Sequence, residues 1–363
     1  MTDRAGRSGH RSVTHGFGIV GCGVIAATHA EAIGAIAGAR LVAVTDTDAD
    51  RATAFARSRG CAAEPDLAAL VCREDIEVIC VCVPSGLHAE VGAEAAAAGK
   101  HLVIEKPMDV SLKAADRLIA AAREAGVRMT VISQHRFDPG PAEVRRLIDA
   151  DAFGRLVLGE AATKWHRRQE YYDSAAWRGT WALDGGSLLN QGIHYADLLR
   201  WCMGPVAGVT AQFATRAHRV ETEDIAVAAL TFASGALGTI VTSTAAFPGS
   251  AQRLEITGTE GTVVIEDGRI TRRALAAEGP EGGGTAAADP VAAADAAAIG
   301  ASAHAAQVAD LLAAIEERRE PSVTGQDGRA ALELACAVYE SAREGRTVVL
   351  PAAPGHGAEA TRE

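Results

Sequence analysis

A glycine motif near the amino terminus has the residue types and spacing of a dinucleotide-binding turn. An apolar run is followed by Gly21 and Gly23, and the small residue Ala26 lies three positions further on. The first glycine permits a tight turn, the second lets a pyrophosphate approach, and the small third residue lets a helix pack closely on a strand. At the start of that helix, the unpaired N–H groups around Val24 and Ile25 would face the phosphates.

A carboxylate after the second apolar run fits the same chemistry. The run 41–45 ends in Asp46, which follows Ala26 by 20 residues. At that position a carboxylate accepts hydrogen bonds from the adenosine ribose hydroxyls and repels a 2′-phosphate. Thr47 and Asp48 offer no obvious grip for such a phosphate, so the sequence favours NAD over NADP.

Two further stretches could carry catalytic chemistry. Glu105-Lys106-Pro107 directly follows an apolar run, which places a lysine at the carboxyl end of a strand, where the nicotinamide should lie. In the stretch 185–197, Asn190 and His194 are four residues apart and would share one face of a helix.

The elements that must position these residues alternate between strands and helices up to about residue 137. Alternating β and α elements predict a parallel, doubly wound sheet. We expect strands at 17–20, 41–45, 76–83, 102–104 and 127–132, and helices at 26–37, 48–59, 88–98 and 111–125.

Beyond residue 137 the pattern changes to several strands joined by short turns, which predicts an α+β domain with a mainly antiparallel sheet. We expect helices at 142–149, 186–202, 303–318 and 327–345, and extended segments at 156–165, 209–215, 225–232, 237–243, 253–258, 262–265 and 348–351.

Composition excludes several classes of protein. The net charge of −11 argues against nucleic acid or an anionic membrane as a partner, and no apolar run approaches the ~20 residues that span a bilayer. The seven cysteines include no Cys-x-x-Cys pair, and no cluster has the spacing of metal ligands. We therefore expect a cytoplasmic protein with reduced thiols and no metal.

In their order along the chain, these motifs resemble the Gfo/Idh/MocA family, named for glucose–fructose oxidoreductase, inositol 2-dehydrogenase and a rhizopine-catabolism protein. The resemblance covers about residues 17–351 and rests on the glycine motif, Asp46, a Pro84-x-x-x-His88 loop, Glu105-Lys106-Pro107 and the stretch 186–197. It implies a Rossmann domain, then a domain with a large open antiparallel sheet that often forms dimer or tetramer contacts. Family members mostly oxidise or reduce a carbinol carbon of sugars, inositols or related polyols.

The resemblance also implies roles for residues. Lys106 and His194 would be the catalytic pair, and Pro84, Ser85, His88 and Glu105 would line the nicotinamide and its ribose together with Lys106.

Asn190 departs from the family pattern, because many relatives carry an aspartate there that relays the substrate proton. A neutral amide cannot accept that proton, so Asn190 would only orient the substrate. The role of base then falls on His194, whose ordinary pKa near 6.5 suits it.

A stretch rich in arginine and aromatic side chains, 164–181, has two interpretations. Aromatic faces stack on sugars and arginines hold carboxylates or phosphates, which would make Arg168, Tyr172, Trp177 and Arg178 substrate residues. Subunit and domain interfaces are also rich in these residue types.

The sequence thus predicts an NAD-dependent oxidoreductase acting on a secondary hydroxyl of a sugar, sugar derivative or cyclitol, active as a homodimer or homotetramer. Two alternatives are a catalytically silent NAD-binding sensor or scaffold and a sugar ketoreductase that prefers NADPH. The predicted organisation is a disordered leader (1–14), a Rossmann domain (15–137), a substrate and oligomerisation domain (138–351) and a disordered tail (352–363). Within the second domain we expect a flexible loop at 274–300 and a helix at 327–346 that packs back on the first domain.

Overall fold

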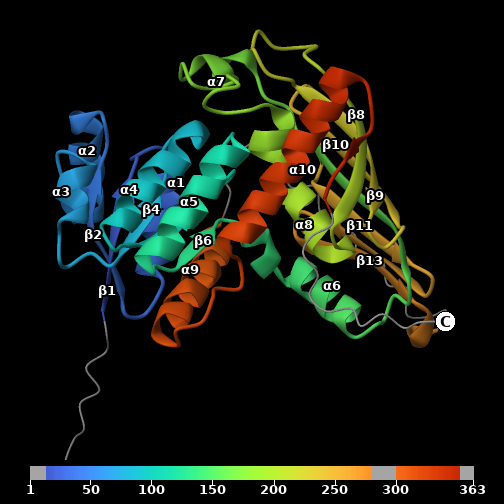
Figure 1. Ribbon diagram of the computed structural model, residues 1–363, viewed down its shortest axis with the longest axis horizontal. Coiled ribbons are helices and arrows are strands. Elements are labelled where there is room, and N and C mark those ends of the chain that lie inside the picture. The colour runs from blue at the N-terminus through green and yellow to red at the C-terminus, as the bar shows by residue number, and fades with distance from the viewer. Residues whose placement is uncertain (1–13, 280–299, 352–363) are drawn as a thin grey trace, which may run out of the picture.

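The computed structural model describes residues 14–279 and 300–351, and its first sheet contains six parallel strands (Figure 1). The strand order β3-β2-β1-β4-β5-β6 is that of a doubly wound Rossmann sheet. Its strands are β1 (His15–Val20), β2 (Ala39–Thr45), β3 (Ala62–Ala63), β4 (Val78–Val81), β5 (His101–Ile104) and β6 (Met129–Val131). The chain order reverses between β1 and β4, so this sheet has its dinucleotide crevice beyond the carboxyl ends of those two strands.

Helices cover both faces of this sheet. One face packs against α1 (Val24–Gly34), α2 (Ala49–Arg59) and α9 (Ala301–Glu316). The other face packs against α3 (Leu67–Val71), α4 (His88–Ala97) and α5 (Leu112–Ala125). The sequence did not predict β3 and α3, because a two-residue strand and a five-residue helix are too short to show a periodic pattern.

The second sheet has eight strands in the order β13-β12-β11-β7-β10-β9-β8-β14. Only β7 and β10 pair in parallel, and the other neighbours are antiparallel. The strands are β7 (Leu156–Lys164), β8 (Val206–Ala214), β9 (Ile225–Phe232), β10 (Leu237–Ser243), β11 (Arg253–Gly258), β12 (Gly261–Glu266), β13 (Arg269–Leu275) and β14 (Val348–Val349). A Rossmann domain followed by a mainly antiparallel sheet confirms the predicted fold class.

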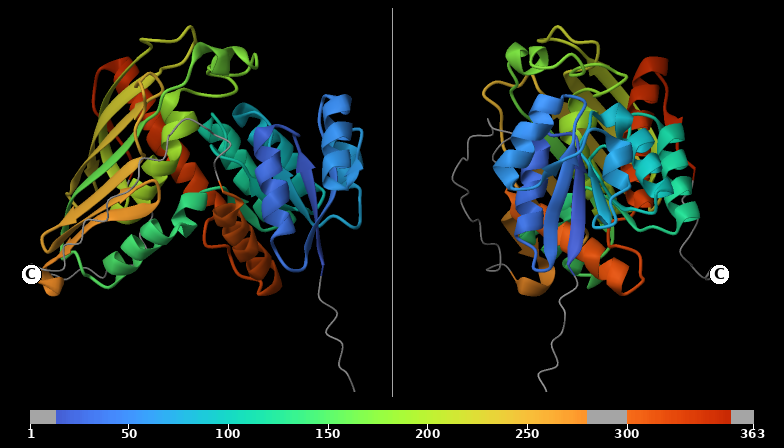
Figure 2. Two further views of the ribbon diagram at one scale, coloured as in Figure 1. Left: turned by 180° about the vertical axis from the view of Figure 1, so that it is seen from behind. Right: turned by 90° about the vertical axis from the view of Figure 1, so that its left-hand side faces the viewer.

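One face of the second sheet is packed and the other is open (Figure 2). Along β9, buried residues alternate with exposed ones, as a half-buried strand requires. The packed face contacts α8 (Ile193–Met203) and α10 (Gly325–Glu344). On the open face Leu158 and Leu237 are exposed, and they are register partners on β7 and β10.

The last helix of the chain, α10, joins the two sheets, whereas α9 packs on the first. The helix α10 contacts β8 and the covering helix α8 on the second sheet, and it also contacts β6 and the covering helix α5 on the first sheet. The helix α9 contacts α1. Two more helices follow the first sheet along the chain, α6 (Pro139–Asp149) and α7 (Gln169–Asp173). None of the helices in the described ranges is long and apolar enough to cross a bilayer.

Some predictions fall outside the described residues, namely the disordered leader up to residue 13, the disordered tail 352–363 and most of the flexible loop, 280–299. The predicted start of the flexible loop at residue 274 was wrong. Residues 274–275 are the end of β13 (Arg269–Leu275), and residues 276–278 form a 3₁₀ turn.

Candidate active site

The turn between β1 and α1 has the shape of a dinucleotide cradle. Gly21 has a φ of 91°, and a Cβ there would lie 2.5 Å from the carbonyl oxygen of Cys82, so only glycine fits. Gly23 is the N-cap of α1 and makes no side-chain cap, while a Cβ on Gly23 would meet nothing within 4 Å. The N–H groups at Val24 and Ile25 therefore open onto free space, which fits a pyrophosphate at the helix start.

Asp46 lies at the end of β2, beside this turn. Its carboxylate accepts hydrogen bonds from the backbone N–H of Cys22 (2.7 Å) and Asp48 (2.9 Å). It also accepts from Arg51, at 3.0 Å from Nε and 2.6 Å from a terminal nitrogen. Burial would raise the pKa of Asp46, but the hydrogen bonds from Arg51 and the two N–H groups outweigh burial and lower the pKa to about 2. The carboxylate is thus charged and already oriented.

Arg51 is a residue that the sequence interpretation missed. It lies in the first turn of α2, where the N-cap side chain of Asp48 accepts a hydrogen bond from the Arg51 backbone N–H at 3.0 Å. The available signal was an arginine five residues after Asp46, the aspartate that we predict to bind the ribose. Arg51 would provide a positive charge where a 2′-phosphate would sit.

The loop after β4 is tied to the loop after β5 by His88. The two ring nitrogens of His88 lie 2.7 Å from the carbonyl oxygen of Pro107 and 2.8 Å from that of Val83. Burial lowers the pKa of His88, so the neutral ring donates to one of these carbonyls at a time. Between Val83 and His88 the chain forms a short 3₁₀ turn, which has Pro84 as its N-cap and begins at the buried Ser85. His88 therefore braces the crevice rather than pointing its nitrogens into open space.

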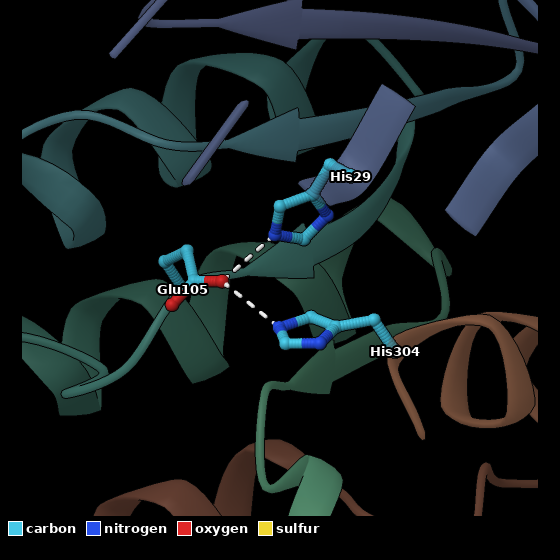
Figure 3. Close-up of side chains that lie close together, drawn as sticks. All are labelled: His29, Glu105 and His304. Atoms are coloured by element: carbon cyan, nitrogen blue, oxygen red, sulfur yellow. Dashed lines mark hydrogen bonds and ion pairs between the residues drawn. The ribbon is translucent and has the colours of Figure 1, made fainter. Parts of the chain in front are cut away.

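Glu105 lies at the end of β5 in a buried polar cluster with His29 of α1 and His304 of α9 (Figure 3). One oxygen of Glu105 is 2.7 Å from His29 Nε2 and 3.7 Å from His304 Nε2, and the other accepts from the Lys106 N–H at 3.0 Å. Burial opposes the charge on both groups. Hydrogen bonds from His29 and His304 nevertheless hold the pKa of Glu105 well below its usual range. Interactions with Cys82, Cys80 and Glu105 hold the pKa of His29 well above its usual range. Both directions favour an ion pair between His29 and Glu105.

The three ligand atoms of this cluster lie within 4.8 Å of one another, close enough to hold a metal ion. Sequence spacing could not reveal the cluster, because positions 29, 105 and 304 are far apart. His29 Nε2 is already hydrogen-bonded to Glu105 at 2.7 Å, and a metal ion bound through these atoms would have to replace this hydrogen bond. We therefore interpret the cluster as an ion pair that fixes the carboxyl end of β5.

Lys106 and His194 approach each other from the two halves of the chain. Lys106 Nζ donates to the backbone oxygen of Asn190 at 2.7 Å, and Lys106 and His194 border the same cavity of about 10 Å³, which has room for one water. The His194 ring is buried, and its centroid is 5.0 Å from that of His135. Burial, then the charges of Lys106 and His135, lower the pKa of His194 well below its usual range. Burial also lowers the pKa of Lys106.

The segment that carries Asn190 is not the regular helix expected over 186–202. Residues Ser187–Gly192 form a π-helix, and α8 begins at Ile193. The buried carboxylate of Glu223 holds its start by accepting from the N–H groups of Ser187 (2.9 Å) and Leu188 (2.8 Å). A Cβ at Gly186 would lie 1.1 Å from a Glu223 oxygen, so glycine is required there.

The side chain of Asn190 is oriented by Asp184, a residue that the sequence interpretation did not select. Asn190 Nδ2 donates to Asp184, and the other Asp184 oxygen accepts from the Gly179 N–H at 2.6 Å. Burial raises the pKa of Asp184. This arrangement leaves the amide oxygen of Asn190 as the atom that can accept a hydrogen bond from a substrate hydroxyl.

Asp197, one turn beyond His194, forms a buried salt bridge with Arg136. The two Arg136–Asp197 hydrogen bonds measure 2.8 and 2.6 Å, and Arg136 also reaches Asp327 of α10 at 3.1 Å. Arg136 therefore links the segment after the first sheet to α8 through Asp197 and to α10 through Asp327, which gives Asp197 a structural role.

The arginine-rich stretch divides into residues near Lys106 and residues away from it. Arg178 stacks on Trp177 and on Tyr171, with its Cζ 4.5 and 4.2 Å from the ring centroids. By contrast, Tyr172 is buried and its hydroxyl bonds to Thr244 at 2.7 Å, while Arg168 is exposed at the N-cap of α7. The residues grouped with Arg178 are therefore Arg167 and Tyr171, because both guanidinium groups stack on the Tyr171 ring. The predicted substrate residues Arg168 and Tyr172 are their neighbours in the sequence and do not belong to this group.

Comparisons with known proteins agree with this geometry. Residues 15–133 match a family described as "Oxidoreductase family, NAD-binding Rossmann fold", and residues 142–264 match the "GFO/IDH/MocA C-terminal domain". Inositol 2-dehydrogenase of Rhizobium meliloti is 31% identical over 338 residues, which are 92% of this chain and 98% of that protein. D-apiose dehydrogenase of Paraburkholderia graminis is 28% identical over 348 residues, 92% of this chain and 88% of that protein.

A solved structure resembles the whole chain. The WlbA dehydrogenase of Bordetella pertussis, solved in complex with NADH and UDP-GlcNAcA, superposes with a TM-score of 0.84 at 34% identity, and the match covers 94% of this chain and 100% of that one.

Proposed function

Since the chain belongs to the Gfo/Idh/MocA family of NAD-binding oxidoreductases, we propose that it transfers a hydride between nicotinamide and a secondary hydroxyl or ketone carbon of a sugar, sugar derivative or cyclitol. The observation that carries this proposal is the meeting of Lys106 and His194 at one small cavity beyond the carboxyl end of β5. The relatives named inositol 2-dehydrogenase and D-apiose dehydrogenase, and the WlbA complex with UDP-GlcNAcA, support this substrate class.

In the proposed mechanism the protein binds the cofactor, orients the substrate and removes one proton from the substrate hydroxyl. Gly21, Gly23 and Asp46 would hold NAD, which supplies the hydride acceptor when it is bound. His194 takes the proton of the substrate hydroxyl, because its lowered pKa keeps the ring neutral and able to accept. The ammonium of Lys106 stabilises the developing alkoxide, and the Asn190 amide oxygen orients the substrate.

Assembly into a homodimer or homotetramer through the open face of the second sheet is part of the same proposal. The exposed register pair Leu158 and Leu237 supports it, because apolar side chains in contact on an exposed sheet often mark an interface. The predicted cytoplasmic location stays a prediction.

The test is an NAD⁺-reduction assay over inositols, aldoses, uronic acids and nucleotide sugars. Loss of the proton acceptor or of the ammonium should lower kcat by roughly 10²- to 10⁴-fold in His194→Ala and Lys106→Ala. Lys113→Ala, which removes an exposed lysine of α5, is the matched control. Turnover that survives both active-site changes would refute the assignment. Cofactor binding without turnover of any substrate would favour the silent binding protein.

A further inference from the structure

Two arginines close to Lys106 lack an acidic partner. Arg167 is 8% exposed, and its Nε is buried without an acceptor, as is the Nε of Arg178. Within residues 14–279 and 300–351, neither guanidinium forms a salt bridge, and the side-chain hydrogen bond of Arg178 goes to the neutral hydroxyl of Tyr171 at 2.6 Å. Arginine stays charged in proteins, and buried charges are normally paired. A bound anion would supply the negative charge that these two side chains lack.

Aromatic rings hold both guanidinium groups in place. Arg167 Cζ lies 5.0 Å from the ring centroid of Trp165 and 5.3 Å from that of Tyr171. Tyr171 also stacks with Arg178, so that one ring orients both cations. Stacking fixes the planes of the guanidinium groups but consumes few of their N–H donors. The donors remain available for an anion.

The pair is connected to the residues that face the substrate. Gln191 Nε2 donates to the Tyr171 hydroxyl at 3.4 Å, and Gln191 follows Asn190, whose backbone oxygen binds Lys106. Burial lowers the pKa of Lys106; the carboxylates of Glu105 and Asp184 oppose this effect, and the charges of Arg178 and Arg167 add to it. The nearby acid, Asp184, already binds Gly179 and Asn190, and burial raises its pKa. Among the residues that the structure describes, Arg167 and Arg178 are therefore left without a carboxylate of their own, although the whole chain carries a net charge of −11.

We propose that Arg167 and Arg178 bind an anionic group of the substrate, so that the enzyme acts on a sugar bearing a carboxylate or a phosphate rather than on a neutral polyol. The guanidinium fork matches either group with two parallel N–H···O bonds. This inference rests on the proposed function, because the reacting carbon is taken to lie between Lys106 and His194 while the anion anchors another part of the same molecule.

The experiment compares substrates that differ only in the anion. Galacturonate is measured against galactose, glucose 6-phosphate against glucose, and a nucleotide-linked uronic acid against the nucleotide-linked hexose, each with NAD⁺. Loss of one charged contact should raise KM for the preferred acid roughly 10- to 100-fold in Arg167→Gln or Arg178→Gln, without a matching change in KM for NAD⁺. Arg219→Gln is the control, because that guanidinium is exposed and belongs to neither set of contacts (its side chain is 83% exposed). Thermal denaturation checks that each variant is folded.

A binding measurement separates the two proposals. Trp165 and Trp177 lie against the arginines, so tryptophan fluorescence of the NADH-bound enzyme reports an anion at this position. Acids that bind through the arginines while no compound is turned over would support the subsite and refute the proposed reaction. Turnover of neutral sugars as efficient as that of their acids, unchanged in both variants, would overturn the subsite and leave the reaction standing. A rise in KM for NAD⁺ alone would assign the arginines to the cofactor phosphates, which also overturns the proposal.

Discussion

Replacing Asp46 by serine should change the cofactor preference from NAD towards NADP. In the structure, the Asp46 carboxylate is held charged by the Cys22 and Asp48 N–H groups and forms two hydrogen bonds with Arg51. Asp46→Ser removes the acceptor for the ribose hydroxyls and the charge that repels a 2′-phosphate. It also releases the Arg51 guanidinium, which can then pair with that phosphate.

The magnitude follows from counting charged hydrogen bonds. One such bond contributes about 1.5–3 kcal/mol, so its loss should weaken NADH binding roughly 10- to 100-fold. A new Arg51–phosphate contact should strengthen NADPH binding by a similar factor. The ratio of the two dissociation constants is therefore expected to change by about 3–6 kcal/mol, or roughly 10²- to 10⁴-fold.

The assay is calorimetric titration with NADH and NADPH, which requires no knowledge of the substrate. Asp50→Ser removes the same charge from an exposed position of α2 and should leave both affinities unchanged. Arg51→Gln added to Asp46→Ser should abolish the gain for NADPH. If NADPH binding fails to improve in Asp46→Ser, or improves equally without Arg51, the role given to this pair is refuted.

Three further outcomes are expected. Burial and the charges of Lys106 and His135 lower the pKa of His194, so the neutral base persists in mild acid. The acid limb of the plot of kcat/KM against pH should therefore lie below pH 6.5. An acid limb at or above that pH would contradict the assignment of His194 as the base. Arg136→Met leaves the buried Asp197 unpaired and should destabilise the fold by about 3–5 kcal/mol, as measured by chemical denaturation, with Arg146→Met as the surface control. Leu237→Glu on the open sheet face should lower the oligomeric mass measured by light scattering, and an unchanged mass would place the interface elsewhere.

Local patterns in the sequence were sufficient for the Rossmann half of the fold. The turn at Gly21 and Gly23, the end of β2 at Asp46 and the strand before Glu105 depend on neighbouring residues, so each motif could be placed on its element. Most of the antiparallel sheet was also predictable, because its strands are joined by short turns, whereas β13 was not predicted. The π-helix at Ser187–Gly192 was not, because its geometry depends on Glu223, a residue from a different part of the chain.

The parts of the candidate site that the sequence did not reveal depend on how loops fold and on where side chains point. Asp184 orients Asn190 only because the loop before the π-helix folds back on it. The neighbours Arg167 and Arg168 have identical side chains, but one is buried and the other is exposed. Residue type alone could not tell which of the two belongs to the site. The predicted roles of Lys106, His194 and the cofactor residues stay predictions until the variants are measured.

The position of α9 has a consequence for how the protein is made. Val308 and Leu311 of α9 complete the apolar cluster that contains Phe17 and Ile33, and His304 completes the cluster around Glu105. During synthesis the first sheet leaves the ribosome long before these residues exist, so one side of α1 stays uncovered until the chain is almost finished. A gene fragment that stops after residue 137 would lack the same cover, and grafting this nucleotide domain into another enzyme would require transferring residues 301–316 as a second piece.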